Sequence, residues 1–132
     1  MTTTADDAAV AKAIDEIRSS FPGHEVLVRE DGEGGAYVTV EDAELGPPYT
    51  QEATWVGARI TFQYPYADVY PLYVRGDLSR VDGQPLGEAT SPTTWEERPA
   101  IQVSRRSNRL DATRDTAAMK LQKVLLWLKE RP

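Results

Sequence analysis

Hydrophobic residues recur at helical spacing near both ends of the chain, which predicts two amphipathic helices. The first helix ends at the Phe-Pro-Gly turn of residues 21–23, and Thr4 with Asp7 resembles a capping box at its start. We expect the second helix to open at Asp111 or Thr113, with Trp127 and Met119 widening its apolar stripe. The predicted buried stripes are Val10, Ala13, Ile14 and Ile17 in the first helix and Ala117, Leu121, Val124, Leu125 and Leu128 in the second.

The region between these helices alternates apolar and polar positions, as strands do. Residues 24–30 and 36–40 alternate in this way and flank a glycine-rich connection at 31–35, which predicts a β-hairpin. The β-branched and aromatic content of residues 54–63 predicts a third strand, and the apolar run at 72–74 predicts a fourth.

Periodicity is lost from Gly76 to Pro99, where glycine, proline, serine and threonine dominate, so we expect a long surface loop. Residues 100–103 are compatible with one further short strand. The predicted fold class is therefore α+β, with an N-terminal helix, a four-stranded antiparallel meander, a long loop and a C-terminal helix.

Length and composition favour one ordinary globular domain. The 132 residues are 40% hydrophobic and 27% charged, and we expect residues 1–132 to form a single domain. No apolar run is long enough to span a membrane, and the acidic start is unlike a secretory signal, so a cytoplasmic location is expected. With no cysteine and one histidine, neither a metal site nor another cofactor is expected.

Charge is distributed unevenly along the chain. Residues 1–97 carry 6 basic and 18 acidic side chains, a net charge of −12, whereas residues 98–132 carry 9 basic and 3 acidic side chains, a net charge of +6. Such asymmetry is typical of a protein-binding surface, although the two halves can also neutralise each other within the fold. The domain as a whole is too acidic to indicate nucleic-acid binding.

Five arginines within seventeen residues are the main candidates for partner contact, because guanidinium groups bind carboxylates and phosphates through paired hydrogen bonds. We expect some of them to pair within the domain instead. The aromatic run of residues 64–73 adds a second candidate surface, of which at least half should be structural. The candidate partner-binding residues are Arg98, Arg105, Arg106, Arg109, Arg114, Tyr64, Tyr66 and Trp95.

Tyr64-Pro65, followed by Pro71 and an apolar strand, resembles the Tyr-Pro signature of the ubiquitin-conjugating enzyme (UBC) superfamily, which includes non-catalytic and RWD relatives. The resemblance covers most of the chain and implies a UBC-like fold. Residues 101–109, with Asp115-Thr116-Ala117 and Lys120-Leu121, look like a bacterial branch whose genes accompany ubiquitin-activating-like enzymes and JAB-type peptidases. That likeness implies a role in a bacterial ubiquitin-like conjugation pathway, including antiphage defence.

The chain departs from the catalytic family because it has neither the His-Pro-Asn motif nor the nucleophilic cysteine. The resemblance therefore implies a non-catalytic binding or scaffold subunit, forming a hetero-oligomer with an activating-like enzyme, a ubiquitin-like modifier or a second conjugating-like protein. Two alternatives remain open: a stand-alone peptide-binding regulatory module, and a transferase that uses a hydroxyl oxyester. The candidate hydroxyl carriers are Ser91, Thr93, Thr94, Ser104 and Ser107.

Overall fold

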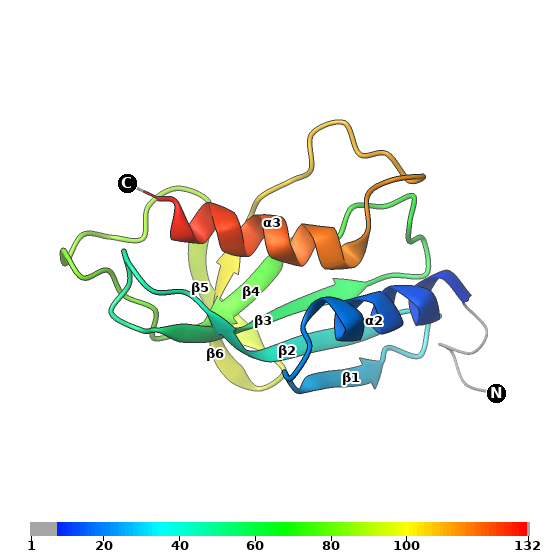
Figure 1. Cartoon of the computed structure of the whole chain (residues 1–132), viewed down its shortest axis with the longest axis horizontal. Helices are drawn as coiled ribbons and strands as arrows, with labels where there is room; N and C mark the ends of the chain where they lie inside the picture. Colours follow the sequence, from blue (N-terminus) through cyan, green and yellow to red (C-terminus); the bar gives the residue numbers. More distant parts are fainter. Residues whose placement is uncertain (1–7, 132) are drawn as a thin grey trace.

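The computed structural model describes residues 8–131 and has an α+β architecture (Figure 1). Two helices, α2 and α3, pack side by side on one face of a six-stranded antiparallel sheet whose strand order is β1-β2-β3-β4-β6-β5. The elements are α2 (Ala8–Ser20), β1 (Val26–Glu30), β2 (Ala36–Glu44), β3 (Ala53–Ile60), β4 (Leu72–Arg75), β5 (Thr90–Trp95), β6 (Arg98–Val103) and α3 (Ala117–Lys129).

The core lies between the helices and the sheet. Both predicted apolar stripes are buried there, against inward-facing residues of the strands such as Val38, Val56 and Val103. Trp127 packs partly buried beside the second stripe, whereas the expectation that Met119 widens it was wrong, because Met119 is exposed. The predicted capping pair at Thr4 and Asp7 falls outside the described residues. Helical periodicity thus identified the core-facing side of α2 and of α3.

The predicted hairpin at residues 24–40 is confirmed as β1 and β2. Its connection is held by Asp31, whose Oδ1 accepts hydrogen bonds from the backbone N–H groups of Glu33 (2.7 Å) and Gly35 (2.9 Å). The predicted third and fourth strands correspond to β3 and β4, although β3 ends at Ile60 rather than at residue 63.

The predicted four-stranded meander was wrong in its strand number, because residues 90–103 form the hairpin of β5 and β6. Two features explain why the hydrophobic pattern did not predict this hairpin. The strand β5 is an exposed edge strand containing Pro92, so its side chains do not alternate between buried and exposed. Its two-residue turn is Glu96-Glu97, with positive φ angles of 47° and 67°, where glycine or asparagine is the usual signal.

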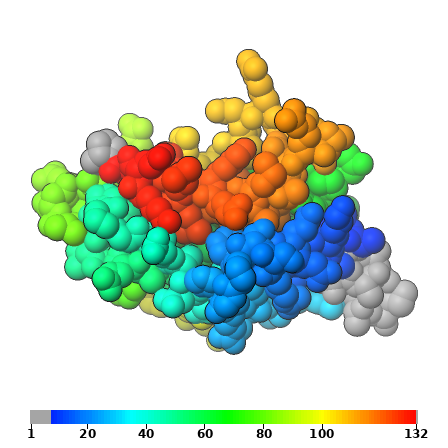
Figure 2. All heavy atoms as spheres, viewed as in Figure 1, coloured from blue at the N-terminus to red at the C-terminus, as the bar shows by residue number. Residues whose placement is uncertain are grey.

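The predicted start of the last helix was also wrong. Thr116 is the N-cap of α3, and its hydroxyl accepts a hydrogen bond from the backbone N–H of Met119 at 3.1 Å. Asp111 and Thr113 instead form a turn, in which Asp111 Oδ1 accepts from the backbone N–H (2.9 Å) and hydroxyl (2.6 Å) of Thr113. Residues 104–116 are therefore a loop, which stands out from the helix layer in Figure 2.

Candidate partner-binding surface

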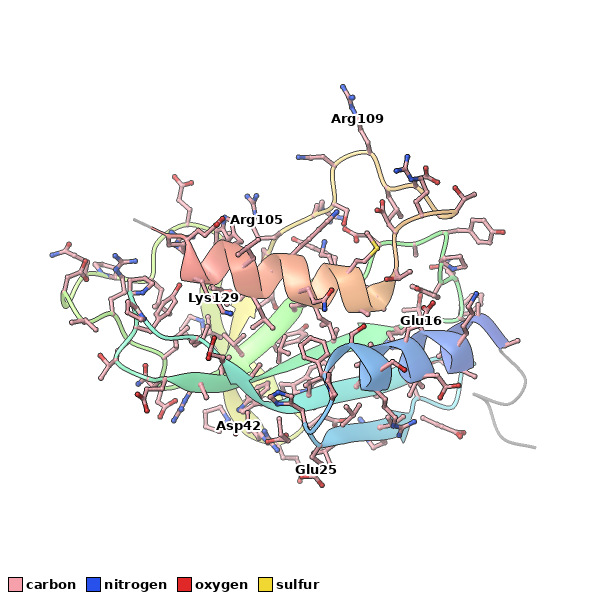
Figure 3. The ribbon with its side chains drawn as sticks, in the orientation of Figure 1. Glu16, Glu25, Asp42, Arg105, Arg109 and Lys129 are labelled. Carbon is pink, nitrogen blue, oxygen red and sulfur yellow. The ribbon has the colours of Figure 1, made fainter. Side chains whose placement is uncertain are left out.

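The structure separates the five candidate arginines into two groups. Arg98 begins β6 on the sheet face that the helices leave uncovered, where its guanidinium pairs with Glu41 at 2.8 Å and lies 5.1 Å from the Trp55 ring centroid. The other four lie on the loop of residues 104–116, and Figure 3 shows Arg109 at its tip and Arg105 beside α3. We call Arg105, Arg106, Arg109 and Arg114 the arginine surface.

The arginines of the sheet and its adjoining loops are ion-paired, whereas those of the arginine surface are not. The paired side chains are Arg29 with Glu96, Arg59 with Asp31, Arg75 with Asp77, Arg80 with Asp82, and Arg98 with Glu41. The four exposed guanidiniums of the arginine surface make no ion pair with any carboxylate of residues 8–131. The loop of residues 104–116 carries these four arginines and two aspartates, so it is a local excess of positive charge in a chain of net charge −6.

Two members of the arginine surface are held in place by aromatic rings. The guanidinium of Arg105 lies 4.9 Å from the ring centroid of Trp127, and that of Arg106 lies 4.1 Å from the ring centroid of Tyr70. Cation–π contact at an exposed position contributes about 0.5–1 kcal/mol and reduces the freedom of the side chain. Both groups therefore keep hydrogen-bond donors available to a partner without being fully mobile.

A groove runs between this loop and α3. It has a volume of about 270 Å³ and is lined by Arg105, Arg106, Asn108, Lys123 and Trp127, among others. Asp115 also lines it, but its Oδ2 accepts a hydrogen bond from the backbone N–H of Asp111 at 2.9 Å. The groove is therefore basic, with an aromatic wall.

Beneath the groove, an ion pair between the buried Lys120 and the half-buried Asp68 fixes the loop to the rest of the fold. The Lys120 ammonium contacts Asp68 Oδ2 at 3.1 Å and donates to the Arg105 carbonyl oxygen at 2.7 Å and to Ser107 Oγ at 3.0 Å. Ser107 donates to Asp68 through its backbone N–H (2.7 Å) and its hydroxyl (2.8 Å). Three chain segments thus meet at one carboxylate.

These contacts also set the protonation of Asp68. Burial alone would raise the pKa of this carboxyl, but the hydrogen bonds from Ser107 and the Lys120 ammonium outweigh it and hold the pKa below its ordinary value. The carboxylate is therefore a weak base, and the Lys120 ammonium has each of its donors engaged by Asp68, Arg105 or Ser107. Such an arrangement is typical of a structural ion pair.

The candidate hydroxyls differ in their surroundings. Ser91, Thr93 and Thr94 are exposed on the edge strand β5, and Ser104 Oγ accepts a hydrogen bond from Gln102 Nε2 at 3.1 Å. Only Ser107, among the five, contacts both a carboxylate and an ammonium. His24 is engaged elsewhere, because its Nδ1 hydrogen-bonds the Glu41 carbonyl oxygen at 2.9 Å and its ring contacts Phe21 edge-on.

The three aromatic candidates, Tyr64, Tyr66 and Trp95, also lie in different surroundings. The Tyr64 hydroxyl accepts a hydrogen bond from the backbone N–H of Ala117 at 3.0 Å, so it supports the start of α3. Trp95 is 7% exposed and donates from its indole to Thr39 Oγ1 at 2.9 Å on the opposite side of the sheet. Tyr66 is 82% exposed, two residues from Asp68. Of the three, only Tyr66 presents its ring to solvent.

The sequence pattern did not identify Asp68 and Lys120, the ion pair that positions the loop of residues 104–116. Lys120 follows Ala117 by three residues and precedes Val124 by four, so it lies on the buried stripe of α3. A lysine on an apolar stripe was the available signal, because a buried ammonium requires a partner.

Comparison with models of protein families, with curated proteins and with solved structures finds no match to this chain. Within residues 8–131, no group of three or more metal-ligating side chains is brought together, and neither helix is long and apolar enough to cross a bilayer. The function must therefore be inferred from the geometry and chemistry of the surfaces.

Proposed function

We propose that this protein is a non-catalytic binding or scaffold subunit that receives an acidic partner on the arginine surface. The observation that carries this proposal is the contrast in pairing. Five of the seven arginines elsewhere, all but Arg18 and Arg131, contact a carboxylate of the domain, while the four exposed arginines gathered on one loop contact none among residues 8–131. Guanidiniums held beside aromatic rings and left unpaired are suited to carboxylates of another molecule.

The proposal includes the pathway that the Tyr-Pro signature implies. The partner is then a ubiquitin-activating-like enzyme, a ubiquitin-like modifier or a second conjugating-like protein, in a cytoplasmic bacterial conjugation or antiphage defence system. The helix-sheet-helix order supports this reading, and the lack of any cysteine for a thioester favours a non-catalytic role within it. In this role the chain positions its partners and performs no bond-making step.

The test uses purified proteins encoded by the genes that flank its own. Size-exclusion chromatography and calorimetry would compare the wild type with the double charge reversal Arg105→Glu/Arg106→Glu. We expect the variant to lose affinity by about tenfold or more, since two attractive contacts become repulsive. Binding of an acidic partner with unchanged affinity would contradict the arginine surface as the contact.

A matched control reverses the same amount of charge elsewhere. Lys12→Glu/Arg18→Glu alters two exposed positions of α2, and we expect it to leave the affinity within about twofold of the wild type. Flanking genes that encode neither an activating-like enzyme nor a modifier would favour the stand-alone peptide-binding module over a conjugation subunit.

One observation favours a second candidate function, an oxyester transferase. The Ser107 hydroxyl donates to Asp68 and accepts from Lys120, so a carboxylate and an ammonium flank one nucleophile. In the transfer step, Ser107 Oγ would form an ester with the modifier's terminal carbonyl, the carbon–sulfur bond of an activating-enzyme thioester would break, and the hydroxyl proton would pass to the departing thiolate.

Intact-protein mass spectrometry separates this candidate from the first. The chain is incubated with ATP, the activating-like enzyme and the modifier, before and after hydroxylamine treatment. An ester predicts a modifier-sized mass increase that hydroxylamine removes and that Ser107→Ala abolishes. Partner co-elution without any adduct would exclude the transferase and support the binding subunit.

A further inference from the structure

The sheet face opposite the helices carries a hollow with a volume of about 590 Å³. It lies between β2, β3 and β4 and the tip of the β5–β6 hairpin, away from the arginine surface. We call it the tryptophan hollow; its charged and aromatic lining is Glu41, Asp42, Trp55, Arg75, Asp77 and Arg98.

Arg98 and Pro99 form the wall of the tryptophan hollow that belongs to the β5–β6 hairpin, and the tip of this hairpin is docked on the sheet. Trp95 stacks on Tyr73, with ring centroids 4.5 Å apart, and lies against Gly57, where any side chain would overlap its indole. The Arg29–Glu96 ion pair (2.9 Å) anchors the other side of the tip. A hollow held in this way exists before a ligand arrives, which lowers the entropic cost of binding.

The hollow already holds one guanidinium of its own chain. Arg98 contacts Glu41 through two nitrogens, at 2.8 Å and 3.4 Å, and lies 5.1 Å from the Trp55 ring centroid. This intramolecular contact shows the chemistry that the walls accept: a planar cation against a tryptophan, with a carboxylate beside it.

A further carboxylate of the hollow lacks a cation. Asp77 is paired with Arg75 and Glu41 with Arg98, whereas Asp42 makes no ion pair with any residue of the described range. Asp42 is exposed on a β-bulge, with a φ of 61°, and Figure 3 shows it at the lower edge of the sheet, in the same region as Glu25. Negative charge is thus in excess where Trp55 faces the hollow.

We propose that the tryptophan hollow is a second binding site, for a single arginine or lysine side chain of a basic peptide segment. The cation lies against Trp55 and pairs with Asp42, repeating the contact that Arg98 makes with Trp55 and Glu41. An anionic ligand is disfavoured because both arginines of the hollow are already neutralised. This site does not depend on the proposed function, since it binds the opposite charge on another face.

The test follows the three tryptophan indole signals of the full chain by two-dimensional ¹H–¹⁵N NMR. The probes are acetyl-Gly-Arg-Gly-amide, its lysine counterpart and a glutamine counterpart as the neutral control. We expect the cationic probes to shift the Trp55 indole saturably, with millimolar affinity, and the glutamine probe to leave it unmoved. Trp127 serves as an internal reference, because it lies beside Arg105 and Arg131 and should not attract a cation.

Asp42→Asn tests the assigned carboxylate without disturbing the bulge, because asparagine tolerates a positive φ. We expect this substitution to weaken the affinity for the arginine probe about fivefold. Glu52→Gln, which removes an exposed carboxylate outside the hollow, should leave the affinity unchanged. Three results would each overturn the proposal. They are equal affinity of the arginine probe for Asp42→Asn and wild type, a shift of the Trp55 indole by the glutamine probe similar to that by the cationic probes, and no saturable shift of Trp55.

Discussion

At the scale of single residues, a buried lysine determines where the candidate binding loop lies. Lys120 interrupts the apolar stripe of α3, and its ammonium links Asp68, Ser107 and the Arg105 backbone. Removing one partner of a buried ion pair costs more than the pair contributes, because a charge is left without compensation. The same residues thus couple stability to the position of the arginine surface.

We therefore expect Asp68→Asn to lower the free energy of unfolding by about 3 kcal/mol, measured by urea denaturation at neutral pH. The double variant Asp68→Asn/Lys120→Met is the control, because it removes both charges. Its loss in free energy of unfolding should be smaller than the summed losses of the single variants Asp68→Asn and Lys120→Met. Additive losses would show that the two side chains do not act as a pair.

The stability contributed by Asp68 should also depend on pH. Because folding lowers the pKa of this carboxyl, the folded protein binds fewer protons there than the unfolded chain does. The contribution is full above the ordinary carboxyl pKa of 3.8 and is lost as the pH falls through the lower folded value. The difference between wild type and Asp68→Asn should therefore shrink in acid; a difference that grows as the pH falls would contradict this assignment.

At the scale of elements, helices were predictable from the chain and the edge hairpin was not. The periodic stripes of α2 and α3 directly encode burial, so both helices and their buried faces followed from sequence. Strand β5 is stabilised by pairing with β6 and by distant contacts of Trp95 with β2, β3 and β4, and such contacts leave no periodic pattern.

The docking of this hairpin predicts the effect of one substitution. Gly57→Ala places a methyl group where the Trp95 indole lies, so we expect a loss of about 1–3 kcal/mol in stability and a weaker near-ultraviolet circular dichroism signal. Thr93→Ala, exposed on β5, should change stability by less than about 0.5 kcal/mol. Equal effects of the two substitutions would mean that the tip does not pack on the sheet in solution.

The candidate site was partly predictable from the sequence. Clustered arginines at 98–114 are visible in the chain, and four of them do share one surface. Arg98 and Trp95 were assigned to the same group, but they are paired at the tip of the β5–β6 hairpin on the opposite face of the sheet. Strand β6 (Arg98–Val103) separates them from the loop that carries the other four arginines, so proximity in sequence did not mean proximity in space.

At the scale of the whole molecule, the two proposed binding sites have opposite charge and lie on different faces of the domain. The arginine surface projects beyond the helices, and the tryptophan hollow lies on the uncovered side of the sheet. A scaffold that brings two partners together needs separate contact surfaces, and differing charge lets each surface discriminate between them.

The charge of the arginine surface predicts a salt dependence. Affinity for an acidic partner should fall steeply as ionic strength rises from about 0.05 M to 0.3 M, because exposed charges are screened over a shorter distance. Calorimetry across this range measures the slope. For the Arg105→Glu/Arg106→Glu variant, the dependence of affinity on salt should be shallower or of opposite sign. A wild-type affinity that does not change with salt would argue for an apolar contact instead.

Partner contact by the arginine surface is best tested by co-elution with quantitative calorimetry, using the proteins encoded beside this gene, among which we expect an activating-like enzyme and a modifier. The comparison sets the wild type and the matched Lys12→Glu/Arg18→Glu control against Arg105→Glu/Arg106→Glu. We expect a stable complex for the first two proteins and its loss in the third, with no covalent adduct on any of them. Equal binding by all three proteins would contradict the arginine surface as the site of partner contact.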